Sequence, residues 1–149
     1  MELLLPNLQF LLFFAFIIPA VFFLLTQQRT LEAIRAENRQ MKPGQVWLQM
    51  IPFFGLIFQF WVIRRIAESI REELNTPTGD SIFAEDGLDI AGKPTYSLGI
   101  TYAILICACI LPLMLLKGIF ALAGMIVWIC YWVQLNRYRV KMKQRILTQ

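Results

Sequence analysis

Residues 46–63 have the sequence VWLQMIPFFGLIFQFWVI, and the arrangement of the whole chain depends on this stretch. It contains no Asp, Glu, Lys or Arg, and its 18 residues are enough to cross a bilayer as one helix. Near its centre, Pro52 removes a helical hydrogen-bond donor and Gly55 relaxes the backbone. The stretch therefore predicts either a straight membrane span or a re-entrant hairpin that is hinged at 52–55 and returns to the side it came from.

Three further uncharged stretches cover 8–25, 96–116 and 118–133. The 149 residues are 58% hydrophobic and 16% charged, whereas a soluble domain is about 45–50% apolar and about 25% charged. The mean hydropathy is +0.59. Backbone groups in lipid must be satisfied internally, which favours helices over open strands. We expect an all-α polytopic membrane protein, a single domain over 1–149 with four apolar helices, of which the second crosses or re-enters.

The last two apolar stretches are separated only by Lys117 and Gly118, which predicts a C-terminal helical hairpin that turns there. The fourth stretch ends in Trp128, Tyr131 and Trp132, an aromatic cluster suited to the headgroup level. The first stretch has no positive segment before it, which favours a permanent anchor over a cleavable signal.

The segment 27–42 carries Leu31, Ile34 and Met41 on one strip, with Arg and Glu elsewhere, which predicts an interfacial amphipathic helix. As a straight helical extension of the first apolar stretch, this segment would rise about 22 Å above the end of that stretch. Only three residues then precede the second apolar stretch, and these reach about 10 Å. The segment must therefore lie along the surface, with a bend near 26–30, or fold back on itself. A solvated loop helix is the alternative.

The tail 134–149 contains five basic residues and no acidic one, and it is expected in the cytoplasm. Four spans would put both termini there. The re-entrant arrangement puts the N-terminus outside and every Lys and Arg except Lys117 inside. The tail cations expected to contact lipid headgroups are Arg137, Arg139, Lys141, Lys143 and Arg145.

The loop 76–95 is acidic, which raises the question of a calcium site. Its acidic residues are Asp80, Glu85, Asp86 and Asp89. Ile82 and Ala84 stand where an EF-hand loop that begins at Asp80 needs oxygen ligands, so we expect a solvated loop.

The sequence contains few of the side chains that enzymes use for catalysis. There is no histidine, hence no imidazole base and no His-bound metal. The three cysteines, Cys107, Cys109 and Cys130, are expected to be small buried hydrophobes. We expect no catalytic residue, no cofactor, no metal site and no nucleic-acid partner.

Small and polar residues inside the apolar stretches suggest two roles. A ridge of small residues lets helices approach closely. The candidates for helix packing are Gly99, Ala103, Cys107, Gly118, Ala121 and Gly124. Gln49, Gln59 and Thr101 are candidates for the lining of a polar pore, although single interhelical hydrogen bonds would also explain them.

The stretch 38–55, NRQMKPGQVWLQMIPFFG, continued by RIAESI at 65–70 and by VWICYWV at 127–133, resembles a pattern in small uncharacterised polytopic membrane proteins of bacteria. The resemblance implies a bacterial cytoplasmic (inner) membrane origin and transfers no activity.

The leading hypothesis is a non-enzymatic integral membrane protein that acts as an accessory subunit or a self-associating scaffold. An oligomeric channel or small transporter is the alternative, and a membrane enzyme is third. The expected partners are the lipid bilayer and either further copies of the chain or a larger membrane complex.

Overall fold

The computed structural model describes residues 4–76, 92–109 and 117–147, and every regular element among them is helical. Helix α1 (Leu4–Glu32) is followed by two 3₁₀ helices, η1 (Ala36–Asn38) and η2 (Pro43–Met50). Helices α2 (Phe54–Asn75), α3 (Tyr96–Ala108) and α4 (Lys117–Leu147) complete the order. The all-α prediction is confirmed.

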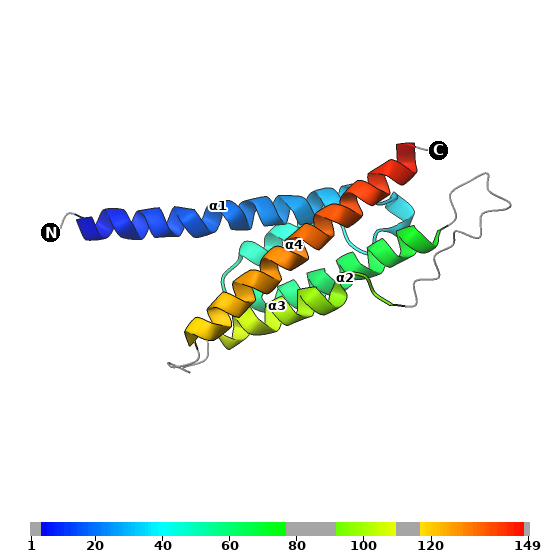
Figure 1. The fold of residues 1–149 in the computed structure, drawn as a ribbon. Coiled ribbons are helices and arrows are strands. Elements are labelled where there is room, and N and C mark those ends of the chain that lie inside the picture. Colours follow the sequence, from blue (N-terminus) through cyan, green and yellow to red (C-terminus); the bar gives the residue numbers. More distant parts are fainter. Residues whose placement is uncertain (1–3, 77–91, 110–116, 148–149) are drawn as a thin grey trace.

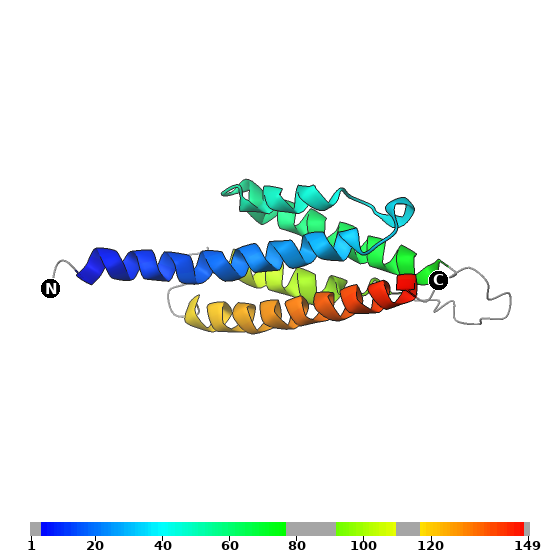
Figure 2. The same ribbon diagram turned by 90° about the horizontal axis from the view of Figure 1, so that it is seen from above.

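The helices form an elongated bundle in which α3 and α4 lie side by side and run in opposite directions (Figure 1, Figure 2). The N-terminal half of α1 extends beyond the other helices. The start of α4 and the end of α3 lie toward the same end of the bundle as this projecting half. The ends of α2 and α4 lie toward the opposite end.

Between η2 and α2 the chain reverses direction in a tight turn at Phe53. Phe53 has φ 62° and ψ −52°, and the Phe54 N–H donates to the Pro52 carbonyl at 2.7 Å. This geometry is a γ-turn, which costs about 1–3 kcal/mol for a residue with a side chain. The Gly55 N–H then donates to the Ile51 carbonyl at 2.7 Å. A Cβ on Gly55 would lie 2.0 Å from the Gln49 carbonyl oxygen, so only glycine allows the arms this close.

The prediction that 46–63 forms one straight span is wrong for this structure. The stretch is divided between η2 and α2, and the break falls at the Pro52–Gly55 hinge that the sequence indicated. Pro52 supplies no N–H to a helix, and the close approach at Gly55 holds η2 against α2. The hairpin geometry of the re-entrant alternative is thus present.

The predicted amphipathic helix over 27–42 and the bend at 26–30 are also wrong, because α1 continues to Glu32 and the chain then folds back. Arg39 reaches this helix end, where its Nε donates to the Ile34 carbonyl at 2.7 Å and its Nη2 to the Glu32 carbonyl at 3.0 Å. These bonds satisfy carbonyls that a helix terminus leaves open. The second expectation for this segment, that it folds back on itself, is confirmed.

The C-terminal hairpin has different boundaries from those predicted. α3 ends at Ala108 instead of 116, and 110–116 lie outside the described residues. Lys117 and Gly118 begin α4 and do not form a turn. α4 continues without interruption through the predicted tail to Leu147, because Leu135 and Met142 lie one heptad apart and are both fully buried. Most of the acidic loop, 77–91, lies outside the described residues.

The core is built on one face of α2 and on an aromatic cluster between α1, α3 and α4. Ile63, Ile66, Ile70 and Leu74 follow a helical spacing and are fully buried. Around Phe23, ring centroids lie 5.5–6.0 Å away, from Tyr102, Trp128, Tyr131 and Trp132. Tyr131, expected at the headgroup level, is fully buried in the protein.

We predict that Gly55→Ala destabilises the protein by about 1–3 kcal/mol, because the new methyl group would overlap the Gln49 backbone. Thermal unfolding of the purified protein in a mild detergent measures the effect.

Gly44→Ala is the matched control, since nothing lies within 4 Å of a Cβ at Gly44. Its stability should stay within about 0.5 kcal/mol of wild type. Equal stability of Gly55→Ala and wild type would show that the two arms do not approach as described.

Candidate functional site

At one end of the bundle, a buried carboxylate fastens the loop after α1 to α2. Glu73 accepts hydrogen bonds from the Arg35 N–H and Nε, both at 3.1 Å, and from Asn38 Nδ2 at 2.7 Å. Arg145 of α4 donates to the Glu73 and Leu74 carbonyls at 3.2 and 3.1 Å. Removing one partner of a buried charge pair is costly, so the bonds of the Glu73 carboxylate hold the loop against α2. The bonds of Arg145 hold α4 against the end of α2.

A second carboxylate, Glu68, joins α2 to the segment before α3. It accepts hydrogen bonds from Lys93 Nζ at 2.8 Å and from Arg64 Nε at 2.9 Å. Burial alone would raise the pKa of Glu68, but these two cations outweigh it and the pKa lies below its ordinary value of 4.5. The hydrogen bond that Arg64 donates to Glu68 in turn raises the pKa of Arg64.

The three residues predicted to line a pore lie apart, and each bonds to another group of the chain. Gln49 Nε2 of η2 donates to Gln27 Oε1 of α1 at 2.6 Å. Gln59 is buried and accepts a hydrogen bond from the Tyr102 hydroxyl at 3.2 Å. Thr101 is exposed and donates to the Ser97 carbonyl. The structure brings none of these three side chains to a shared hollow.

The six small residues divide into buried and exposed positions. A Cβ on Gly99 would lie 2.5 Å from Ile63 Cγ2, so α2 and α3 meet there. Ala103 is fully buried, and Gly124 faces Leu105 of α3. Cys107 is half-buried and receives a long contact of 3.8 Å from Gln59 Nε2. Gly118 and Ala121 are exposed on α4.

All three cysteines are free thiols. Cys107 and Cys109 are half-buried, but Cys130 is exposed, contrary to the expectation of a buried hydrophobe, because it lies on the outer face of α4. Among residues 4–76, 92–109 and 117–147, no group of three or more Cys, Asp or Glu is placed to hold a metal ion.

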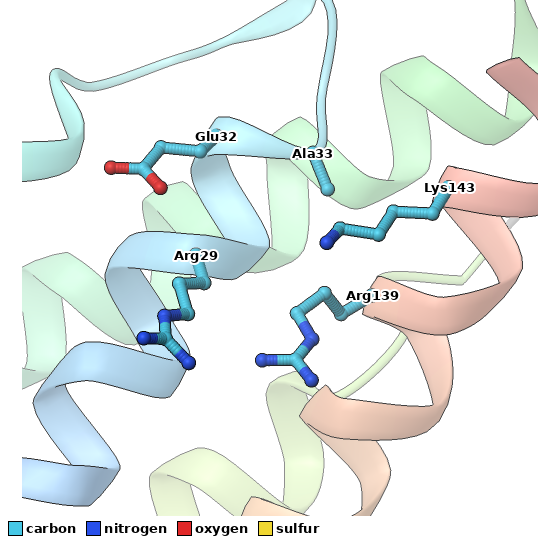
Figure 3. Close-up of a pocket in the computed structure, with 5 residues that line it drawn as sticks. All are labelled: Arg29, Glu32, Ala33, Arg139 and Lys143. Carbon is cyan, nitrogen blue, oxygen red and sulfur yellow. The ribbon is translucent and has the colours of Figure 1, made fainter.

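The tail cations do not form one uniform surface, because two of them face α1 across a groove. A hollow of about 320 Å³ is lined by Arg29, Glu32 and Ala33 of α1 and by Arg139 and Lys143 of α4. Figure 3 shows Arg139 and Lys143 reaching from α4 toward α1, with Arg29 lying along the face of α1 beside them, while the Glu32 carboxylate points away from the gap. Glu32 instead accepts a hydrogen bond from Gln28 Nε2 at 2.8 Å.

A second hollow of about 470 Å³ adjoins the first and shares Arg139 with it. Its other lining residues are Thr26 of α1 and Trp132, Val133, Asn136 and Arg137 of α4. Trp132 Nε1 donates to Thr26 Oγ1 at 2.8 Å, which ties the two helices together at this point. We name the two hollows together the α1–α4 groove.

The sequence indicated the α4 side of this groove and missed the α1 side. Arg139 and Lys143 were predicted to meet lipid headgroups, but Arg29 was assigned to a separate interfacial helix. Arg137 lines the groove, whereas Lys141 is exposed outside it and Arg145 bonds to the end of α2. Only the crossing of α1 over α4 brings Arg29 to this set.

We predict that Glu68→Gln lowers the free energy of unfolding by about 1 kcal/mol at neutral pH, because charge-assisted hydrogen bonds to Lys93 and Arg64 are lost. Since the folded pKa lies below 4.5, this stabilisation is complete above pH 4.5 and disappears as the pH falls through the folded value. The free energies of unfolding of wild type and Glu68→Gln, measured from neutral pH down into acid, should become equal at the acid end.

Glu37→Gln is the control. The Glu37 side chain is 69% exposed, and its ion pair with Arg35 is long, at 3.7 Å, so its loss should change the stability little. A difference between wild type and Glu68→Gln that persists unchanged at low pH would contradict the ionic origin of the effect.

Comparison with known proteins identifies no relative: no protein-family model matches this chain, and neither the curated proteins nor the solved structures contain a match. Function is therefore inferred from the geometry of the chain itself.

Proposed function

We propose that this protein is a non-enzymatic integral membrane protein of the bacterial cytoplasmic membrane that acts as a self-associating scaffold, or as an accessory subunit of a larger membrane complex. One observation carries the proposal: the bundle separates its exposed apolar side chains from its charged side chains along its length.

The apolar half of the bundle exposes large hydrophobic side chains. On α4, Gly118–Arg145 is long and apolar enough to cross a membrane, and only 17% of its most apolar window is buried. Exposed large hydrophobic residues also occur on α1, at the turn before α2, on the first half of α2 and on α3. They include Phe14, Ile18, Phe22, Phe53, Ile57, Ile104, Ile119, Leu122, Met125, Ile126 and Ile129. In water such a surface would be a liability, whereas in lipid it is the expected exterior.

The charged half collects segments that are distant in the sequence. Contacts of Glu73 and Glu68 tie the loop after α1, the second half of α2, Lys93 and the end of α4 to one another. Every Lys and Arg except Lys117 belongs to these segments or to the end of α1. Because basic residues near membrane ends favour the cytoplasm, we place this half inside the cell and the N-terminus outside.

The hairpin formed by η2 and α2 then enters the membrane from the cytoplasmic side. From Phe54 to Arg64, α2 rises about 15 Å, half of a hydrocarbon core of about 30 Å. Phe53 at the tip is 85% exposed and Ile57 is 78% exposed, as lipid-facing residues should be. Pro52 has no N–H, and the Ile51 and Pro52 carbonyls accept hydrogen bonds within the turn, which lowers the cost of burying this backbone in lipid.

Self-association is favoured by the outer face of α4. Exposed Gly118 and Ala121 would let a helix of a second copy approach closely, among exposed Ile119, Leu122 and Met125. A channel would need polar side chains along one water-filled path, and Gln49, Gln59 and Thr101 bond separately within the chain. The scaffold is therefore preferred to the channel.

We predict that Lys42, Gly92 and Lys141 all face the cytoplasm. In a cysteine-free background, a cysteine at any of these positions should react with a membrane-impermeant maleimide only after the cells are permeabilised. A cysteine at Gly118 should react in intact cells and is the positive control. Reaction of the Lys42→Cys variant in intact cells would instead support a straight span over 46–63.

We further predict that Ala121→Leu reduces the mass of the protein measured by light scattering in a mild detergent, because a larger side chain separates the helices of two copies. Ala36→Leu is the control: Ala36 is also exposed, but in η1 at the charged end. A wild-type protein that is monomeric and has no stoichiometric partner would contradict the proposed function.

A further inference from the structure

We infer that the α1–α4 groove binds the phosphate group of an anionic phospholipid, with an acyl chain lying along the adjoining apolar faces of α1 and α4. This inference rests on the proposed membrane placement. It names a ligand class and a site to which both α1 and α4 contribute.

The first observation is an uncompensated positive charge. Arg29, Arg139 and Lys143 converge on one hollow (Figure 3), and among the described residues no carboxylate pairs with any of the three. The one acidic residue that lines the hollow, Glu32, is turned toward Gln28. Arg139 Nε is buried without a hydrogen-bond partner in the described part of the chain. Like charges that line one hollow repel one another, and a bound anion would relieve the repulsion.

The second observation concerns the kind of anion. Two guanidinium groups and one ammonium group can donate to several oxygens of one phosphate, and arginine forks match phosphate geometry in particular. The first hollow, of about 320 Å³, has room for a headgroup. A phosphodiester therefore fits both the charge and the donors present.

The third observation distinguishes a lipid from free phosphate. The second hollow continues from Arg139 to Trp132 and Val133, toward the apolar half of the bundle. Phe22 and Ile18 precede Arg29 at helical spacing on α1, and Ile129 precedes Val133 on α4, and all of these side chains are exposed. A free phosphate would occupy only the cationic end, whereas a phospholipid would fill both parts.

The fourth observation is the level of the groove along the bundle. It lies where the exposed apolar surface ends and the charged half begins, and Trp132 lies at this boundary with its N–H bonded to Thr26. Tryptophan prefers the same headgroup level in membranes. A lipid phosphate in the cytoplasmic leaflet would therefore reach the groove without leaving the bilayer.

The test uses the full-length protein in phosphatidylcholine micelles, titrated with phosphatidylglycerol and monitored by native mass spectrometry. Phosphatidylglycerol should bind in preference to phosphatidylcholine. Arg29→Gln should weaken its binding about fivefold, and the double variant Arg139→Gln/Lys143→Gln more than about tenfold, because each cation near the phosphate contributes to affinity.

Arg71→Gln is the control, since this substitution also removes one positive charge, but from α2 and outside the groove. Its phosphatidylglycerol affinity should stay within about twofold of wild type. Unfolding temperatures of all variants without phosphatidylglycerol should agree with wild type, which shows that the groove variants fold.

Two results would overturn the inference. In one, wild type, Arg29→Gln and the double variant bind phosphatidylglycerol equally. In the other, glycerol phosphate or inorganic phosphate binds as tightly as phosphatidylglycerol, which assigns the groove to free phosphate. Flotation with phosphatidylcholine vesicles separates the two proposals: a protein that floats but shows no preference for phosphatidylglycerol contradicts the groove alone, and one that does not float contradicts the membrane placement.

Discussion

The close approach of η2 and α2 at Gly55 constrains the rest of the structure. With a γ-turn at Phe53 and no Cβ on Gly55, the Gln49 carbonyl can lie against the start of α2. The chain then leaves the turn in the direction from which it came, so the loop after α1 lies beside the second half of α2. Glu73 can therefore bond to Arg35 and Asn38, and the charged segments collect at one end of the bundle. A straight helix over 46–63 would have separated these segments by the length of the span.

The hairpin also determines which surfaces remain exposed. Because η2 packs against α1 and α2, and α2 packs against α3, their polar groups find partners inside the chain: Gln49 bonds to Gln27, and Gln59 to Tyr102. The outward faces of α1 and α4 expose many large apolar side chains, among them Phe22 and Ile126. Between these two helices, at the start of the charged half, Arg29 and Arg139 meet without a carboxylate between them. The fold thus leaves a cationic groove at the level where lipid headgroups would lie.

Sequence reasoning predicted the features that depend on local residue patterns. Long uncharged runs predicted the helices, and Pro52 and Gly55 located the reversal. Features that depend on distant contacts were missed. The end of α1 is fixed by the Arg39 side chain, and the continuity of α4 depends on burial of Leu135 and Met142. Arg29 joined the groove only through tertiary packing, and no local pattern signals that α1 and α4 lie together.

The measurement that tests the hairpin most directly is the distance between spin labels at Lys42 and Arg64 in lipid vesicles, obtained by pulsed electron paramagnetic resonance. Both side chains are exposed, and they flank the two arms. Gln40 lies beside Ser69, to which its N–H donates at 2.9 Å, so the returning arms hold the two labelled positions near each other. If the arms return as described, the two labels should give one short distance. A distance of about 30 Å or more, as for a continuous helix rising 1.5 Å per residue, would contradict it.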